Sequence, residues 1–193
     1  MEKSRIAILA SGNGTNAEAI IRYFQNHPRI EVGLVLSNNP KAFVLDRAKN
    51  LSVPTVTFTR EDFKSETQFL PILREHQISH IVLAGFLWLI PEYLIHAFPD
   101  KIINIHPALL PKYGGKGMYG MKVHEAVKSA ADKETGITIH LVNAHYDEGK
   151  ILFQASCPVE ETHSPGQIAE CVHKLEHEHY PLVIERWIID AEG

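Results

Sequence analysis

Short runs of apolar residues alternate along the chain with longer segments in which apolar residues recur every three or four positions. The run Ile6–Ala10 predicts a strand that is buried on both faces of a sheet. Ala17, Ile20, Ile21 and Phe24 follow it at the spacing of one helical face. Because this strand–helix order repeats along the chain, the pattern predicts an α/β fold with a doubly wound, mostly parallel sheet.

The later elements follow the same signals until the last third of the chain. Further strands are expected at 32–36, 55–59, 80–86 and 101–105, and helices at 43–50, 61–76, 91–98 and 123–130. The segments 135–142 and 151–159 then predict an antiparallel strand pair at one edge. Ser164 and Gln167 have capping-box spacing, so a long C-terminal helix is expected from there, with Pro181 kinking or restarting it.

The composition is that of an ordinary globular chain and argues against several function classes. With 193 residues, 45% of them apolar and 22% charged, the chain suits one domain, residues 1–193, with a sizeable core. A net charge of −4 without a Lys or Arg block argues against nucleic acid as a partner. The longest apolar stretch, Ile81–Ile90, is too short to cross a bilayer, so no membrane association is expected.

The chain contains two cysteines, Cys157 and Cys171. They could pair, but two cysteines are too few for a disulfide framework, and a reducing compartment is the simpler expectation. The apolar run near the N-terminus is shorter than the core of a secretory signal. The sequence therefore predicts a cytoplasmic protein.

Turn-forming residues follow the first expected strand, in the order Ser11, Gly12, Asn13, Gly14, Thr15 and Asn16. Glycines let backbone N–H groups approach an anion, and the helix that begins here adds its dipole, so a phosphate fits. The loop is not a full G-x-G-x-x-G motif, because Ala17 stands at the third glycine, and it lacks the Lys of a Walker loop. A tight turn without a ligand remains an alternative.

Asn104 and His106 lie at the carboxyl end of the strand expected at 101–105. They are two residues apart and so point to the same face, at the sheet edge where α/β folds bind ligands. An amide and an imidazole that converge there suit a carbonyl oxygen that becomes an oxyanion. The alternative for the histidine is a packed residue without a chemical role.

Two further motifs carry candidate chemistry. Asp147, in the polar connection 143–150, could orient His106 or accept a proton through water, or it could simply form a hairpin turn. His173, Glu176 and His177 match the H-x-x-E-H pattern of zinc proteases. No third metal ligand is identifiable, so no metal is expected.

Taken in order, these motifs resemble the phosphoribosylglycinamide formyltransferase family, folate-dependent enzymes of purine biosynthesis. The resemblance covers nearly the whole chain and rests on the glycine loop, Leu83-Ala-Gly-Phe86, Asn104-Ile-His-Pro-Ala-Leu-Leu-Pro111, the Asp147 loop and Glu176. It implies formyl transfer from 10-formyltetrahydrofolate, the cosubstrate, to the amine of glycinamide ribonucleotide by direct attack. It also implies small-molecule substrates, with a monomer or homodimer expected.

The resemblance assigns roles to individual residues. Asn104 would hydrogen-bond the formyl oxygen, His106 would stabilise the oxyanion, and Asp147 would hold His106 and relay the proton through water. The nucleotide would lie against Gly12, Asn13, Gly14, Thr15 and Asn16, with Pro107 and Glu176 beside its ribose and amine. The folate would lie between two groups of residues, Leu87, Trp88 and Leu89 on one side and Val142, Ala144 and His145 on the other.

Some positions differ from the family pattern, and related activities share its motifs. Ala108, Glu66 and Glu148 stand where Ser, Arg and Gly are common, and the segment 114–121 is longer, with a glycine content that predicts a mobile lid. Formyltetrahydrofolate deformylase and methionyl-tRNA formyltransferase share the Asn, His and Asp set but normally carry a further domain. A nucleotide-binding module without catalysis is the alternative from another class.

Overall fold

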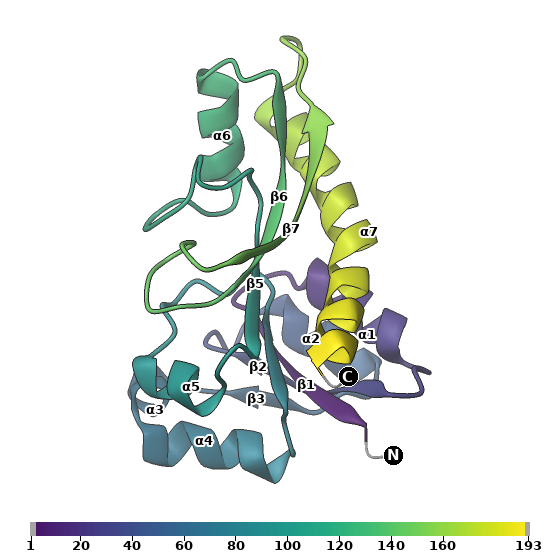
Figure 1. The fold of residues 1–193 in the computed structure, drawn as a ribbon, viewed down its shortest axis with the longest axis vertical. Helices are drawn as coiled ribbons and strands as arrows, with labels where there is room; N and C mark the ends of the chain where they lie inside the picture. The colour runs from purple at the N-terminus through teal and green to yellow at the C-terminus, as the bar shows by residue number, and fades with distance from the viewer. Residues whose placement is uncertain (1–2, 192–193) are drawn as a thin grey trace.

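One sheet of seven strands, in the order β3-β2-β1-β4-β5-β6-β7, forms the centre of the computed structural model, which describes residues 3–191 (Figure 1). The strands are β1 Ser4–Leu9, β2 Ile30–Ser37, β3 Thr55–Thr57, β4 His80–Leu83, β5 Ile102–His106, β6 Glu134–Leu141 and β7 Ile151–Pro158. Strands β1 to β5 are parallel, whereas β6 runs antiparallel to β5 and β7 antiparallel to β6. The expected doubly wound, mostly parallel sheet with a C-terminal antiparallel pair is confirmed.

Helices cover both faces of the sheet (Figure 1). One face is covered by α1 (Thr15–Phe24), α2 (Phe43–Asn50) and α7 (Pro165–Ala191), the other by α3 (Arg60–Lys64), α4 (Glu66–Glu75) and α5 (Glu92–Ala97), while α6 (Met121–Ser129) contacts α7. Ile6 and Ile8 pack into the core on the α1 side, and Ala7 and Leu9 pack into the core on the α4 side. Strand β1 is therefore buried on both faces, as its apolar run predicts.

Several expected elements differ from the structure by a residue or two at their ends, and three differences matter for the site or the fold. The single helix expected at 61–76 is two helices, because Ser65 adopts an extended conformation that ends α3 before α4 begins. Strand β4 ends at Leu83 rather than Phe86, and the chain then enters the loop that lines the cavity described below. Helix α7 continues through Pro181 without restarting.

The start of α7 has the predicted capping box. The Ser164 N–H donates to Gln167 Oε1 at 2.9 Å, and the Gln167 N–H donates to Ser164 Oγ at 3.3 Å. Behind this cap, Cys157 of β7 and Cys171 of α7 are joined as a disulfide, with their Cα atoms 6.7 Å apart. None of the helices within residues 3–191 is both long and apolar enough to cross a bilayer.

Candidate active site

A cavity of about 650 Å³ lies where the carboxyl ends of β1, β4 and β5 meet. Strand β1 lies between β2 and β4, so the order of the strands reverses at this point. Open α/β sheets bind ligands at such a reversal, and a cavity of this volume suits small molecules.

Nearly all the residues expected to touch substrates line this cavity. They are Gly12, Asn13, Gly14, Thr15, Asn16, Leu87, Trp88, Leu89, Asn104, His106, Pro107, Val142, His145, Asp147 and Glu176. Ala144 is the exception and is not part of the wall. Residues from the segment 115–120 complete one side.

The loop between β1 and α1 presents backbone N–H groups at the start of a helix. Within residues 3–191, no acceptor is found for the N–H groups of residues 12–16. Gly14 has a φ of +78°, and a Cβ placed there would lie 2.3 Å from Cγ2 of Val44 on α2. Free N–H groups, close packing and the positive end of α1 give this loop the properties of an anion site.

A carboxylate connects the polar residues at the end of β5. Asp147 Oδ1 lies 3.5 Å from Asn104 Nδ2 and 3.6 Å from His140 Nε2, and its Oδ2 lies 3.5 Å from His106 Nδ1. Asn104 Nδ2 also lies 3.2 Å from His140 Nε2. The structure therefore brings Asn104, His106 and Asp147 together, as the sequence predicts.

Asp147 is held in its ionised form by these neighbours. It lies in the β6–β7 loop with a φ of +57°, and its Oδ2 accepts a hydrogen bond from the Gly115 N–H at 3.0 Å. Burial acts to raise the pKa of Asp147, but the hydrogen bond from His140 and the proximity of His106 outweigh it and leave the pKa below its ordinary value. A buried carboxylate that stays charged can orient an imidazole and exchange protons.

His106 lies between two acceptors. Its Nε2 contacts the Tyr113 carbonyl oxygen at 2.6 Å, and its Nδ1 faces Asp147. Burial lowers the pKa of His106, although Asp147 and the Tyr113 carbonyl oppose this shift. The buried ring is therefore neutral at pH 7, and it has an acceptor for the N–H on either nitrogen.

Glu176 connects the first and last helices at the cavity wall. Its Oε2 accepts hydrogen bonds from Asn16 Nδ2 at 3.0 Å and from His173 Nδ1 at 2.8 Å, and only 5% of the residue is exposed. The hydrogen bond to Glu176 raises the pKa of His173. His177 is exposed, and within residues 3–191 no three His, Cys, Asp or Glu side chains are grouped as a metal site requires.

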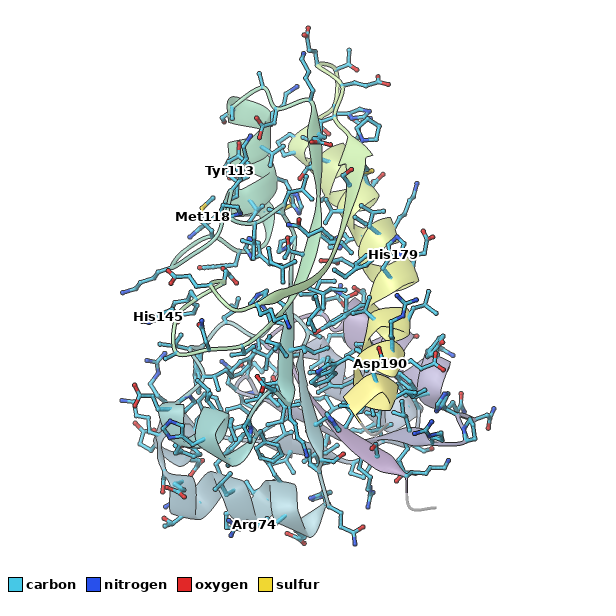
Figure 2. The ribbon with its side chains drawn as sticks, viewed as in Figure 1. Arg74, Tyr113, Met118, His145, His179 and Asp190 are labelled. Carbon is cyan, nitrogen blue, oxygen red and sulfur yellow. A yellow bond between two sulfur atoms is a disulfide. The ribbon has the colours of Figure 1, made fainter. Side chains whose placement is uncertain are left out.

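The mouth of the cavity is apolar and partly exposed. Leu87 and Leu89 remain 45% and 43% exposed, and the Arg60 guanidinium lies 4.7 Å from the centre of the Trp88 ring. Figure 2 shows Met118 and His145, two further residues of the wall, on the side of the molecule away from His179 of α7. Such a surface suits a flat, partly aromatic ligand.

Two histidines of the wall were missed by the sequence reasoning. His140 stands opposite Asn104 in the β5–β6 register, and the alternation of apolar residues along β6 could have placed it on the polar face. His124 of α6 is 2% exposed and its Nδ1 has no hydrogen-bond partner within the described residues. Burial lowers the pKa of His124 to about 4. No local signal in the sequence indicates that His124 faces the cavity.

Comparison with known proteins places this site in a family. Residues 4–184 match the family model described as formyl transferase. The chain belongs to the formyl transferase family. This membership confirms the resemblance inferred from the motifs.

Several relatives carry the name phosphoribosylglycinamide formyltransferase. The chain is 35% identical to phosphoribosylglycinamide formyltransferase of Bacillus subtilis, a match that covers 94% of this chain and 93% of that protein. It is 36% and 35% identical to the chloroplastic enzymes of Arabidopsis thaliana and Vigna unguiculata, of whose lengths it spans 64% and 61%. The crystal structure of phosphoribosylglycinamide formyltransferase from Bacillus halodurans is similar with a TM-score of 0.86 at 34% identity, covering 97% of both chains.

Proposed function

We propose that the chain transfers a formyl group from 10-formyltetrahydrofolate to the amine of glycinamide ribonucleotide. The observation that carries the proposal is the contact of one carboxylate, Asp147, with both Asn104 and His106 in a cavity that also contains a phosphate-type loop. The names of the relatives supply the acceptor and the formyl group, and the folate donor is what the resemblance to the family implies. Asn104, His106 and Asp147 are the proposed catalytic residues.

The ribonucleotide occupies the end of the cavity formed by α1 and α7. Its phosphate lies on the N–H groups of residues 12–16, which are free to donate. Glu176, fixed by Asn16 and His173, and the neighbouring Pro107 lie beside the ribose and the amine. The folate lies against the apolar mouth, from Leu87 to Leu89 and along the wall that contains Val142 and His145.

The proposed reaction is a direct acyl transfer. The amine nitrogen attacks the formyl carbon, and the carbonyl electron pair moves onto its oxygen. Asn104 and His106 donate hydrogen bonds to this oxyanion, which replaces the Tyr113 carbonyl as the acceptor at His106 Nε2. Asp147 accepts the amine proton through water and returns it to the folate nitrogen as the carbon–nitrogen bond breaks.

The decisive experiment measures tetrahydrofolate release from 10-formyltetrahydrofolate with and without glycinamide ribonucleotide. Release that depends on the ribonucleotide supports the transferase. Release without it would identify a deformylase, and no release from folded protein would point to a binding module. Either of these two results would overturn the proposal.

The variant Asp147→Asn tests the proposed chemistry. We expect kcat to fall about 10²–10⁴-fold, because the amide cannot accept the proton, while KM for the ribonucleotide changes little. The neighbouring Glu148→Gln is the matched control, since Glu148 is exposed and does not line the cavity. If Asp147→Asn retains kcat within a few-fold of wild type, the proton-relay role is wrong.

The single-domain organisation, the cytoplasmic location and the monomeric or homodimeric state remain predictions. Size-exclusion chromatography with light scattering measures the last of these directly. None of the three enters the argument for the reaction.

A further inference from the structure

Arg47 of α2 lies behind the loop that presents the free N–H groups. Its Nε donates to the Asn13 carbonyl oxygen at 2.8 Å, and its Nη2 donates to Asn13 Oδ1 at 2.9 Å. Its Nη1 forms an ion pair with Glu18 of α1, and its guanidinium carbon lies 4.8 Å from the centre of the Phe43 ring. Arg47 is thus held on several sides, and it does not itself line the cavity.

The contacts behind this loop determine where its N–H groups point. In a planar trans peptide, the carbonyl and the next N–H point in opposite directions. The Gly12 carbonyl accepts from the Val44 N–H at 3.1 Å, the Asn13 carbonyl from Arg47, and the Gly14 carbonyl from the Glu18 N–H at 2.9 Å. The N–H groups that follow these carbonyls, those of residues 13–15, therefore point away from these partners.

The middle contact is the one that a side chain supplies. The other two carbonyls are bound by backbone N–H groups of α2 and α1, which any residue at those positions would provide. The Asn13 carbonyl depends on the Arg47 guanidinium alone among the described residues. Without it, the peptide between Asn13 and Gly14 is free to rotate, and glycine permits that rotation.

We infer that Arg47 is a positioning residue for the substrate phosphate: it holds the Asn13 carbonyl and so aims the Gly14 N–H at the anion. The inference rests on the proposed function, since it takes the phosphate of the ribonucleotide as the ligand. The effect is one of geometry, because the guanidinium contacts the Asn13 carbonyl and does not itself line the cavity.

A purely structural role for Arg47 gives a different expectation. In that case it only ties α2 to α1 through Glu18, and its loss would lower the free energy of unfolding without a specific loss of phosphate binding. Arg22 offers a matched control, because its Nε and Nη2 also bind Glu18, at 3.0 and 2.8 Å, without touching the loop. A variant of Arg22 therefore removes a Glu18 partner and leaves Asn13 in place.

The first experiment titrates ribose 5-phosphate into the full chain by calorimetry, which needs no turnover. We expect Arg47→Ala to weaken binding about tenfold or more, Arg47→Lys to recover part of it, and Arg22→Ala to bind as wild type does. Circular dichroism and thermal unfolding confirm that each variant is folded. Equal affinity of wild type and Arg47→Ala, or no binding by the wild type, would overturn the inference.

The second experiment compares glycinamide ribonucleotide with its dephosphorylated riboside as acceptor. We expect Arg47→Ala to raise KM for the ribonucleotide about tenfold with little change in kcat, and to leave kcat/KM for the riboside unchanged. Equal losses with both acceptors would show a merely structural role. If the wild-type protein binds ribose 5-phosphate but transfers no formyl group, the proposed function is wrong. The role of Arg47 in phosphate binding is then decided by the titration alone.

Discussion

Two glycine-containing segments line the cavity, the loop at 11–16 and the segment at 115–120, and one glycine of each, Gly14 and Gly117, shows a different constraint. At Gly14 a Cβ would lie 2.3 Å from Val44 Cγ2 and 2.8 Å from the Val44 Cα, so the residue must be small. At Gly117, which has a φ of +90°, a Cβ would meet nothing within 4 Å. The first glycine is required by packing, whereas the second is favoured by backbone conformation only.

The two segments also differ in how their hydrogen bonds tie them to the helices. Three successive carbonyls of the first loop are bound by α1 and α2. In the second segment, the Gly115 N–H donates to Asp147 and the Met118 N–H donates back to Gly115. The difference indicates that the loop at 11–16 is preformed and that the segment at 115–120 is more adaptable, and the lid remains a prediction.

Among the variants that test this difference, Gly14→Ala should have the largest effect on stability and on KM. The added methyl group collides with α2 in a left-handed backbone conformation, so we expect a loss of about 2–4 kcal/mol in the free energy of unfolding. KM for glycinamide ribonucleotide should rise at least about tenfold, because the loop must move away from the phosphate. Urea unfolding and steady-state kinetics measure both quantities. An unchanged KM would show that the loop is not preformed.

Acidification should destabilise the region around the segment 115–120 before it destabilises the loop at 11–16. His124, on the helix that follows the segment 115–120, is buried with a pKa lowered from 6.5 to about 4. In the unfolded chain the His124 imidazole takes up a proton at a higher pH than in the folded protein. The free energy of unfolding is therefore unaffected above about pH 6.5 and decreases as the pH falls towards 4. The expected loss is of the order of 2–3 kcal/mol, with burial of His106 acting in the same direction.

Urea unfolding between pH 7 and pH 4 measures this dependence, and His124→Gln should flatten it. Hydrogen exchange should increase first in residues 114–129 and later in residues 11–16. Equal increases in exchange in both regions would contradict the prediction that the loop at 11–16 is the more stable of the two.

The variant Gly117→Ala should have the smallest effect. No atom obstructs the new methyl group, and only the positive φ opposes it, at about 1 kcal/mol. We expect kcat to change by less than about threefold and KM for the ribonucleotide to stay the same. A collapse of activity as large as that of Gly14→Ala would mean that the segment has one required conformation.

Much of the fold could be predicted because its signals are local. The apolar run of β1 and the capping box of α7 each lie within a few residues, and the structure has both. The helix expected at 61–76 was wrong in its continuity, since a single extended residue, Ser65, divides two segments that share one apolar pattern. Boundaries of this kind depend on one backbone conformation, which periodicity does not report.

The site was predictable where its residues fall in motifs at strand ends. The loop at 11–16 and the pair Asn104 and His106 are of this kind, and they line one cavity. His124 and Arg47 were missed because their positions arise from contacts between distant segments, whereas the alternation along β6 could have indicated His140. Arg47, for example, is 34 positions from the residue that it binds, and nothing near it in the sequence indicates that contact.

The hydrogen bond between Asn16 and Glu176 joins residues 160 positions apart, and Tyr180, on the same helix as Glu176, donates to the Leu83 carbonyl beside the cavity. During synthesis on the ribosome, the first five strands and the loop after β1 emerge long before α7. A nascent chain therefore has the loop at 11–16 while it still lacks the part of the cavity wall that contains Glu176. The emergence of α7, rather than the folding of the parallel sheet, completes the cavity.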